Sequence, residues 1–376
     1  MRDHLVIAVF AFCIAAPALV GALGITEIPE FTENRALKPF PKLASGADAF
    51  LRGLDGYISD RFGFRPLLIT SVNYLKLLMQ VPTNRFVVFG KDGWLFSLYL
   101  HQNFKVADVE SYARTFVERA DWIEHRGAQF TIFVVPRKEV IYREYLPDWM
   151  RPVAGGASGI DMFRAALGAH PIDVFYPKEA MLDDKAMAKL FYRYDMHWTP
   201  AGAFFGAKAL LDHLHERNHS VPVFAESDYT LDVPGPECIR RKYDGGRLDL
   251  LVLQGAPALS ERCPDVARKG GWTAKEALNS RSEWVYTKDD PSLPTAVFYS
   301  DSFGPGLRRI VAEYFRRSVF VHPFAEGGII DKFAPAAVKE EKPDIVVYLR
   351  TEWALYGQTD NPPEVRNLAS GVTGEK

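Results

Sequence analysis

The chain has 376 residues, of which 48% are hydrophobic, 24% charged and 13% aromatic. This composition excludes a disordered, fibrous or coiled-coil protein and predicts a large core, which we interpret as one domain with additional segments. The formal net charge is only −2, from 45 Lys and Arg against 47 Asp and Glu, so the chain lacks the cationic surface that phosphate-backbone binding needs. Nucleic acid is therefore not an expected partner.

The chain begins with an uncharged apolar run from Leu5 to Gly24, preceded by Arg2. A run of this length can cross a hydrocarbon core of about 30 Å, so residues 1–25 are predicted to be a retained signal-anchor. The alternative is a cleaved signal peptide, because Val20-Gly21-Ala22 resembles a small-residue cleavage site and Pro17 can interrupt the helix. Either interpretation exports the rest of the chain.

Export determines how the three cysteines are interpreted, because disulfides form in oxidising compartments. Cys13 lies within the apolar run, which leaves Cys238 and Cys263 as a pair 25 positions apart. In an oxidising compartment they could close a disulfide loop worth about 3–4 kcal/mol in the chain-entropy model, and two buried free thiols are the alternative. Neither cysteine has a second Cys or His at metal-ligand spacing, so a metal site is not expected.

Three kinds of segment follow the apolar run. Residues 26–45 are aperiodic and contain Pro and Glu, which favours a linker. Apolar residues at helical spacing predict two helices between Ala47 and Met79, with a break at Gly63 to Pro66. RFVVFGKDGWLFS then has two β-rich runs around a Lys-Asp-Gly turn, which is typical of a hairpin.

The rest of the chain alternates between apolar strands and helices. Continuous β-branched and aromatic runs predict strands in QFTIFVVP, TAVFYS, SVFVHP and DIVVYLR, with a short strand at Ile172 to Tyr176. Helices are expected near residues 108–125, 178–190, 199–216, 306–317 and 331–341. This order indicates an α/β fold, in which a parallel sheet is flanked by helices.

We assign the α/β domain to residues 46–360. Within it, residues 221–294 are rich in Gly, Pro and Arg and show little periodicity, so we interpret them as an insertion or lid. Residues 361–376 are interpreted as a C-terminal tail.

Asp195 and His197 end a polar loop, and Thr199-Pro200 opens a helix with an N-cap residue and a proline in the first turn. Because the two side chains can lie side by side, the carboxylate could orient the imidazole and stabilise its protonated form. His197 is therefore a candidate general base. The alternative is a structural histidine that packs on the helix, with Asp195 as a turn residue.

Ser302 follows the strand TAVFYS at a predicted strand-to-helix turn. Such a serine projects at the C-terminal edge of a parallel sheet, where the helix N-terminus offers backbone N–H groups to a developing oxyanion. Ser302 is therefore a candidate nucleophile, and a simple helix cap is the alternative. A Ser-His-Asp set would require the fold to bridge the 105 positions between His197 and Ser302.

These blocks resemble a known family. YSDSF resembles the nucleophile block of SGNH hydrolases, and DMHWTPAGA resembles the Asp-x-His-Trp block of the alginate O-acetyltransferase family. Ordinary SGNH hydrolases have the serine block first, whereas here Asp195 and His197 precede Ser302, which is the circularly permuted order of this family. Further similar segments are ENRALKPFP, SDRFGFR, FGKDGWLF, VVPRKEVIYREYLP and KPDIVVYLRTEW.

The resemblance implies an SGNH-hydrolase-like, flavodoxin-like fold. It also implies a periplasmic O-acetyltransferase, anchored to the inner membrane, that modifies an exported polysaccharide such as alginate. By position, Ser302 would carry the acetyl group, His197 would be the base and Asp195 would orient it, with the Ser302 amide in the oxyanion hole. A membrane-bound O-acyltransferase would be the acetyl donor, the polysaccharide would be the acceptor, and no cofactor or metal is implied.

Two alternatives to a transferase stay open. A carbohydrate acetylesterase would use the same triad, because the two enzymes differ only in the nucleophile that reaches the acyl-enzyme. A non-catalytic polysaccharide-binding scaffold would keep the fold alone.

Some residues depart from the family pattern or stand outside it. Ser300 lies where the nucleophile block usually has Gly, and Trp353 replaces an Arg expected beside Glu352. Lys138, just after a strand, either faces the cleft or is solvated. The remaining histidines of interest are interpreted as structural or solvated rather than as metal ligands, namely His213, His215, His219 and His322.

Overall fold

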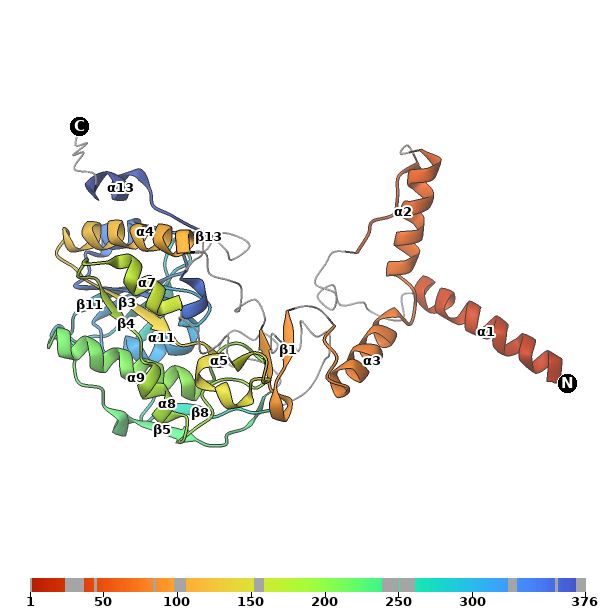
Figure 1. Ribbon diagram of the computed structural model, residues 1–376, viewed down its shortest axis with the longest axis horizontal. Coiled ribbons are helices and arrows are strands. Elements are labelled where there is room, and N and C mark those ends of the chain that lie inside the picture. Colours follow the sequence, from red (N-terminus) through yellow and green to blue (C-terminus); the bar gives the residue numbers. More distant parts are fainter. Residues whose placement is uncertain are drawn as a thin grey trace. The chain divides into compact units, whose positions relative to one another are not determined.

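The structure is a computed structural model (Figure 1). It describes residues 2–23, 37–43, 46–83, 86–97, 106–151, 159–238, 250, 261–323, 330–355 and 358–369. The chain forms two compact units, one of residues 1–87 with 249–259 and a larger one of residues 88–248 with 260–376. The interpreted linker over residues 26–45 lies mostly outside the described residues.

The N-terminal unit is helical. Its elements are α1 (Arg2–Ala22), α2 (Ala47–Asp60) and α3 (Arg65–Leu78). By length and composition, α1 is long and apolar enough to cross a membrane over His4–Gly21. The two helices expected between Ala47 and Met79 are present, but they group with α1 and not with the large domain that we had begun at residue 46.

A seven-stranded sheet forms the centre of the larger unit. Its order is β4-β3-β14-β11-β12-β10-β9, in which the first five strands are parallel and the last two add antiparallel pairs. The parallel strands are β3 (Gln129–Val135), β4 (Asp173–Phe175), β11 (Thr295–Ser300), β12 (Arg317–Val321) and β14 (Ile345–Thr351). All five strands predicted from apolar runs are therefore present.

Helices cover both faces of this sheet (Figure 1). One face packs against α8 (Lys178–Asp184), α9 (Pro200–Arg217) and α11 (Gly304–Ala312). The other packs against α4 (Val106–Glu124), α7 (Gly159–Leu167), α12 (Ala336–Glu341) and α13 (Pro363–Ala369). Side chains of β14 alternate between the two cores, with Val347 on the first face and Tyr348 on the second, as a strand buried on both sides requires.

The interpreted insertion contributes more than a lid. Its last two strands, β9 (Lys275–Leu278) and β10 (Trp284–Thr287), extend the central sheet. Its other described strands form two small antiparallel sheets, β5 (Tyr229–Asp232) with β8 (Asp265–Arg268) and β6 (Glu237–Cys238) with β7 (Glu261–Arg262). Periodicity did not reveal these strands because they are short.

Short elements complete the larger unit. The predicted hairpin is present as β1 (Val87–Phe89) and β2 (Leu95–Ser97), joined by the 3₁₀ turn η3 (Lys91–Gly93). Further short elements are α5 (Lys138–Ile141), η5 (Arg143–Tyr145), η6 (Glu226–Asp228), η7 (Glu352–Ala354), β13 (Ile330–Lys332) and β15 (Gln358–Asp360). The helix expected over 331–341 begins only at Ala336, because β13 pairs with β15. The interpreted tail forms α13, which packs on α4.

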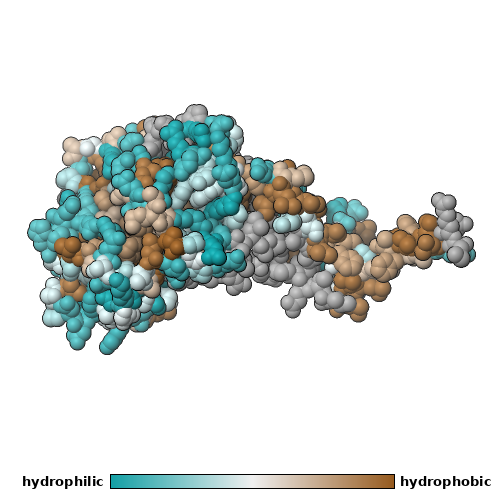
Figure 2. Space-filling view, turned by 90° about the horizontal axis from the view of Figure 1, so that it is seen from below, coloured by the Kyte–Doolittle hydropathy of each residue, from teal (hydrophilic) through white to brown (hydrophobic). Residues whose placement is uncertain are grey.

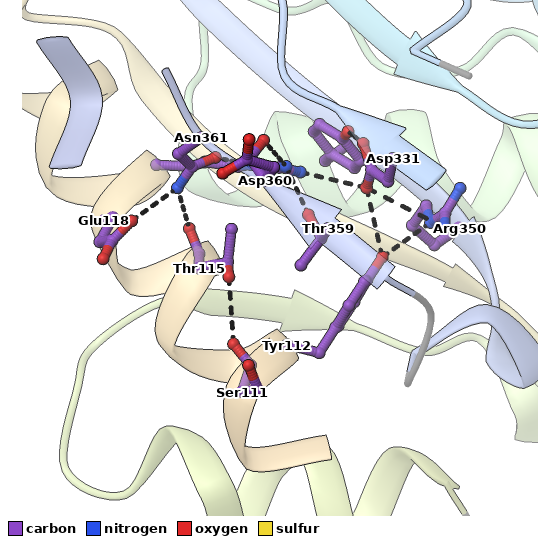
Figure 3. A network of polar contacts seen from close by, with 11 residues as sticks. Ser111, Tyr112, Thr115, Glu118, Asp331, Arg350, Thr359, Asp360 and Asn361 are labelled. Carbon is purple, nitrogen blue, oxygen red and sulfur yellow. Dashed lines mark hydrogen bonds and ion pairs between the residues drawn. The ribbon is translucent and has the colours of Figure 1, made fainter. Parts of the chain in front are cut away.

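A buried polar network ties the C-terminal segments to α4 (Figure 3). Asp331 Oδ2 lies 3.1 Å from Arg119 Nη1 and 4.0 Å from Arg350 Nη2. The hydroxyl of Tyr348 donates to Asp331, and Arg350 Nε donates to Tyr112 Oη at 2.9 Å. One buried carboxylate therefore balances two guanidinium groups inside the helix-sheet interface.

Candidate active site

The loop before α9 is closed at its base. Phe191 and Trp198 form an isolated antiparallel bridge, and the Thr199 amide donates to the Leu190 carbonyl at 2.8 Å. Thr199 is the N-cap of α9, since its hydroxyl oxygen accepts from the Gly202 amide at 3.1 Å. These bonds fix the start of the helix, and with it the position of the residues just before it.

Within this loop, Asp195 and His197 contact each other directly. His197 Nδ1 lies 2.7 Å from Asp195 Oδ1, and the His197 backbone amide donates to the same oxygen at 2.8 Å. Asp195 is fully buried and His197 is 6% exposed. Because a carboxylate only accepts, Nδ1 carries the proton and Nε2 presents its lone pair.

Ser302 meets this lone pair. Its Oγ lies 2.8 Å from His197 Nε2, although the two residues are 105 positions apart. Ser302 is exposed, unlike the other two members. The structure thus places Asp195, His197 and Ser302 in one hydrogen-bonded line that ends at the surface.

The turn that carries Ser302 is tied to the neighbouring strand. Asp301 Oδ2 accepts from the amide and the hydroxyl of Thr351, at 2.8 and 3.1 Å, and its Oδ1 accepts from the Phe303 amide at 3.0 Å. Thr351 is the last residue of β14, which pairs with β11. Asp301 therefore holds the sharp turn between β11 and α11 at the carboxyl edge of the sheet.

Trp198 aligns the two helices that carry the site. It is buried, and its ring lies edge-on to Phe303 at a centroid distance of 5.3 Å. A Cβ at Gly306 would lie only 2.7 Å from Trp198 Nε1, so the indole occupies the space left by this glycine of α11. Because Trp198 follows His197 and Phe303 follows Ser302, this packing sets the distance between base and hydroxyl.

Two buried ionisable side chains bind the backbone of this loop. The Lys138 ammonium donates to the carbonyl oxygens of Leu95, Arg193 and Asp195, at 2.6, 2.9 and 3.1 Å. The Glu261 carboxylate accepts from the amide of Arg193 at 2.9 Å. Lys138 is therefore neither solvated nor a cleft residue as we had expected, because these carbonyls enclose a side chain that is 2% exposed.

Replacing Lys138 by Met should destabilise the protein by about 2–4 kcal/mol, because buried carbonyl oxygens lose their donor. Burial lowers the pKa of Lys138 to about 7, despite the opposing charges of Glu139, Glu261 and Asp195. Between pH 7 and the ordinary pKa of 10.5 the unfolded chain then binds more protons than the folded one. The free energy of unfolding of the parent chain should therefore rise with pH across this window, and that of Lys138→Met should lack this component.

Urea unfolding of both chains across that window measures the difference, which can reach about 1.4 kcal/mol per pH unit for one proton. Lys138→Arg is the matched control, because it keeps a donor but no longer titrates in this range. Identical pH slopes for the parent and Lys138→Met would contradict the prediction.

A second cluster of polar residues lies at the same edge of the sheet. The sequence did not predict that these residues come together. Glu352, directly after β14, is fully buried; its Oε2 accepts from Tyr176 Oη at 2.7 Å and lies 3.6 Å from Arg137 Nε. Burial, together with the Glu352 charge, raises the pKa of Tyr176 well above its ordinary value. Glu352, Tyr176 and Arg137 follow β14, β4 and β3, respectively. The one sequence signal that could have predicted their proximity is that each comes after a strand of the same parallel sheet.

The departures from the family pattern have structural consequences. Ser300 Oγ occupies the space beside Gly304, where an added Cβ would lie 2.1 Å away. His322 Nδ1 lies 3.1 Å from the Ser300 carbonyl oxygen, in keeping with its interpretation as a structural histidine. Within the part of the chain that the structure describes, the Ser302 amide donates to no acceptor, which leaves it available to an oxyanion.

The other histidines and cysteines considered from the sequence do not form a metal site among the described residues. His213 Nε2 lies 2.9 Å from Asp173, and His215 Nδ1 lies 2.7 Å from the Val221 carbonyl. No group of three or more potential metal ligands occurs among the described residues. Cys263 is disulfide-bonded, whereas Cys13 is a free thiol; the side chain of Cys238 lies outside the described residues.

Comparisons with known proteins concern the family and the fold. Residues 87–242 match a family model described as "SGNH hydrolase-like domain, acetyltransferase AlgX". The resemblance to the alginate O-acetyltransferase family is thereby confirmed. The matched range contains Asp195 and His197 and ends before Ser302.

Curated relatives support the same family. A "probable alginate O-acetylase AlgJ" of Pseudomonas putida is 34% identical over 133 residues, which cover 34% of this chain and 33% of that protein. The corresponding protein of Pseudomonas syringae pv. tomato is 30% identical over 133 residues, covering 33% of this chain and 32% of that protein. The chain thus spans about a third of the length of the curated relatives that it matches.

Solved structures extend the likeness over the larger part of the chain. Bacillus cereus PatB1 matches with a TM-score of 0.55 and 13% identity, covering 73% of this chain and 98% of its own. A DHHW family protein from Eubacterium siraeum matches with a TM-score of 0.50 and 16% identity, covering 72% and 95%. At these identities the likeness concerns the fold, which is the SGNH-hydrolase-like α/β architecture expected from the sequence.

Proposed function

We propose that the protein is an O-acetyltransferase that acetylates hydroxyl groups of an exported polysaccharide, alginate or a similar polymer, through an acetyl-serine intermediate. One observation carries the proposal. Asp195, His197 and Ser302 form a continuous hydrogen-bonded line of 2.7 and 2.8 Å whose outer end is exposed. The relatives named as alginate O-acetylases support the choice of acetyl and polysaccharide.

In the first half-reaction, His197 Nε2 takes the proton of Ser302 while Oγ attacks the carbonyl carbon of an acetyl ester. Asp195 keeps Nδ1 protonated and stabilises the imidazolium that forms. The Ser302 amide and the N-terminus of α11 face the developing oxyanion. Collapse of the tetrahedral intermediate breaks the ester bond of the donor, and His197 returns the proton to the departing alcohol oxygen.

The second half-reaction runs in the opposite direction. A sugar hydroxyl gives its proton to His197 and attacks the acetyl-serine carbonyl, and Ser302 regains the proton when the acetylated sugar leaves. Water competes for the same intermediate, so transfer depends on the acceptor occupying the exposed side of Ser302. The carbonyl bonds of Lys138 keep the Asp195-His197 loop in register through both half-reactions.

The location follows from the same proposal. α1 serves as a retained anchor in the inner membrane, which holds the catalytic unit on the periplasmic side. There a membrane-bound O-acyltransferase supplies the acetyl group, and the polysaccharide arrives as the acceptor. The length and apolar composition of α1 support the anchor, and the relatives named as alginate O-acetylases support the polysaccharide acceptor.

Product analysis tests the activity. The purified chain is incubated with 4-nitrophenyl acetate as donor and an oligosaccharide of alginate as acceptor, and products are separated by mass spectrometry. Acetylated oligosaccharide that forms with the parent chain and not with Ser302→Ala supports the transferase. Acetate alone, in the presence of saturating acceptor, would make the protein an acetylesterase. Binding of the oligosaccharide without any ester cleavage would make it a scaffold.

A further inference from the structure

In the N-terminal unit, α3 presents an exposed apolar face. Six of its apolar residues and Met79, the residue after it, are between 42% and 67% exposed; the six are Leu67, Leu68, Val72, Tyr74, Leu75 and Leu78. At about 100° per residue they fall within an arc of about 160° on one side of the helix. Figure 2 shows hydrophobic side chains gathering over the helices of the N-terminal unit, whereas the larger unit is mostly hydrophilic. An exposed apolar face of this kind indicates a site that binds another protein or a membrane.

The charges around α3 indicate what covers it. Arg65 and Lys76 lie at the edge of the apolar arc, and α3 itself carries no acidic residue. From Arg61 to Arg85, within the N-terminal unit, the chain has four basic residues and no Asp or Glu, although its net charge is −2. An apolar face bordered by basic side chains is the pattern of helices that lie in the interface of an anionic membrane.

The link between α3 and α1 supports the same partner. The Gly63 amide, in the turn before α3, donates to the Pro17 carbonyl of α1 at 3.1 Å. A Cβ at Gly63 would lie 2.4 Å from that oxygen, and a Cβ at Gly21 would lie 2.4 Å from the Arg61 carbonyl, so the two backbones cross in close contact. α3 therefore begins beside the last turn of the segment that is able to cross a membrane.

The length of α3 distinguishes lying on a membrane from crossing it. Its 14 residues span about 21 Å, which is shorter than a hydrocarbon core of about 30 Å. We propose that α3 is an interfacial helix that lies in the same anionic lipid surface that α1 enters, with its Leu-rich face toward the acyl chains. In this position α3 is a second membrane contact of the chain, separate from the anchor and from the acetyl-transfer chemistry.

Depth measurements on the full chain test the proposal. In a Cys13→Ser background, a single cysteine is placed at Leu75 on the apolar face of α3, or at Ser227, an exposed residue of the larger unit, as the matched control. Each is labelled with an environment-sensitive fluorophore, and the background chain without an added cysteine gives the blank. The chains are reconstituted into vesicles of phosphatidylcholine, with and without phosphatidylglycerol, that contain brominated lipid as quencher.

The label at Leu75 should be quenched several-fold more than the label at Ser227, since an interfacial helix places its apolar face about 5–10 Å below the headgroups. Quenching should increase with phosphatidylglycerol, and Arg65→Gln with Lys76→Gln should remove that increase. Equal quenching at both positions would overturn the proposal. Oxidative cross-linking of Leu75→Cys chains into dimers, without quenching, would also overturn it, because a second copy would then cover the face.

Discussion

Ser302→Ala should lower the rate of acetyl transfer by about 10⁴- to 10⁶-fold, as expected when the nucleophile of a serine triad is removed. The reason lies in the geometry, because the only hydroxyl placed 2.8 Å from His197 Nε2 among the described residues is that of Ser302. The fold should be unaffected, since the Ser302 side chain is exposed. The measurement compares kcat and KM for acetyl transfer with the thermal unfolding temperature of the same preparation.

The double variant provides a sharper test of the triad. Residues that act as one unit are not additive, so Ser302→Ala combined with His197→Ala should be no slower than Ser302→Ala alone. Ser292→Ala, in an exposed turn of the same unit, is the matched control and should retain the parent activity. If the two triad substitutions multiplied their effects, Ser302 and His197 would act separately and the proposed mechanism would be wrong.

Asp331→Asn should lower the free energy of unfolding by about 3–5 kcal/mol, the usual result when one partner of a buried ion pair is removed. Asp331 is fully buried, and its substitution leaves the guanidinium groups of Arg119 and Arg350 without a carboxylate inside the core. The network in Figure 3 joins α4, β13 and β14, so the loss should affect the whole larger unit. Urea unfolding at neutral pH measures the effect.

The pH dependence of this network has a defined sign. Burial alone would raise the pKa of Asp331, but the charges of Arg119 and Arg350 and the bonds from Tyr348 and Arg119 outweigh it and lower the pKa below the ordinary 3.8. Its contribution to stability is therefore complete above pH 3.8 and is lost as the pH falls through the lower, folded-state value. The parent chain and Asp331→Asn should converge in stability only in strong acid.

An exposed ion pair provides the control for Asp331. Asp148 lies 2.8 Å from Lys91, but its side chain is 81% exposed, so water and salt replace the interaction when it is removed. Asp148→Asn should leave the unfolding curve close to that of the parent. Equal effects of the two substitutions would show that Asp331 contributes no more than a surface charge.

Apolar runs and helix-capping residues were sufficient to predict much of the fold. The apolar run in QFTIFVVP predicted β3, and the N-cap Thr199 with Pro200 predicted the start of α9, because both signals depend on neighbours in the chain. Hydrophobic periodicity did not predict strands that are short or that are stabilised only by pairing with another strand. Part of the predicted helix over 331–341 is instead β13, whose partner β15 lies far along the chain. β9 and β10 fall within the predicted insertion, because each has only four residues.

The same division applies to the site. The spacing of Asp195 and His197 made them candidates for a carboxylate that orients an imidazole, with a structural histidine as the alternative, because two residues of one loop can meet without further folding. The structure shows the direct contact. The role of Lys138 could not be predicted, because its acceptors come from β2 and from a loop more than fifty positions away. Glu352 with Arg137 and Tyr176 was missed for the same reason.

The sequence alone determined the apolar segment that is able to cross a membrane, the alternating strands and helices, and the two short blocks that carry Asp195, His197 and Ser302. These features depend on hydrophobic period and on residues close together in the chain. Only the tertiary structure decided that Ser302 Oγ meets His197 Nε2 across 105 positions. That contact arises because β11 lies beside β14 in the sheet, and because Trp198 packs into the space that Gly306 leaves between α9 and α11.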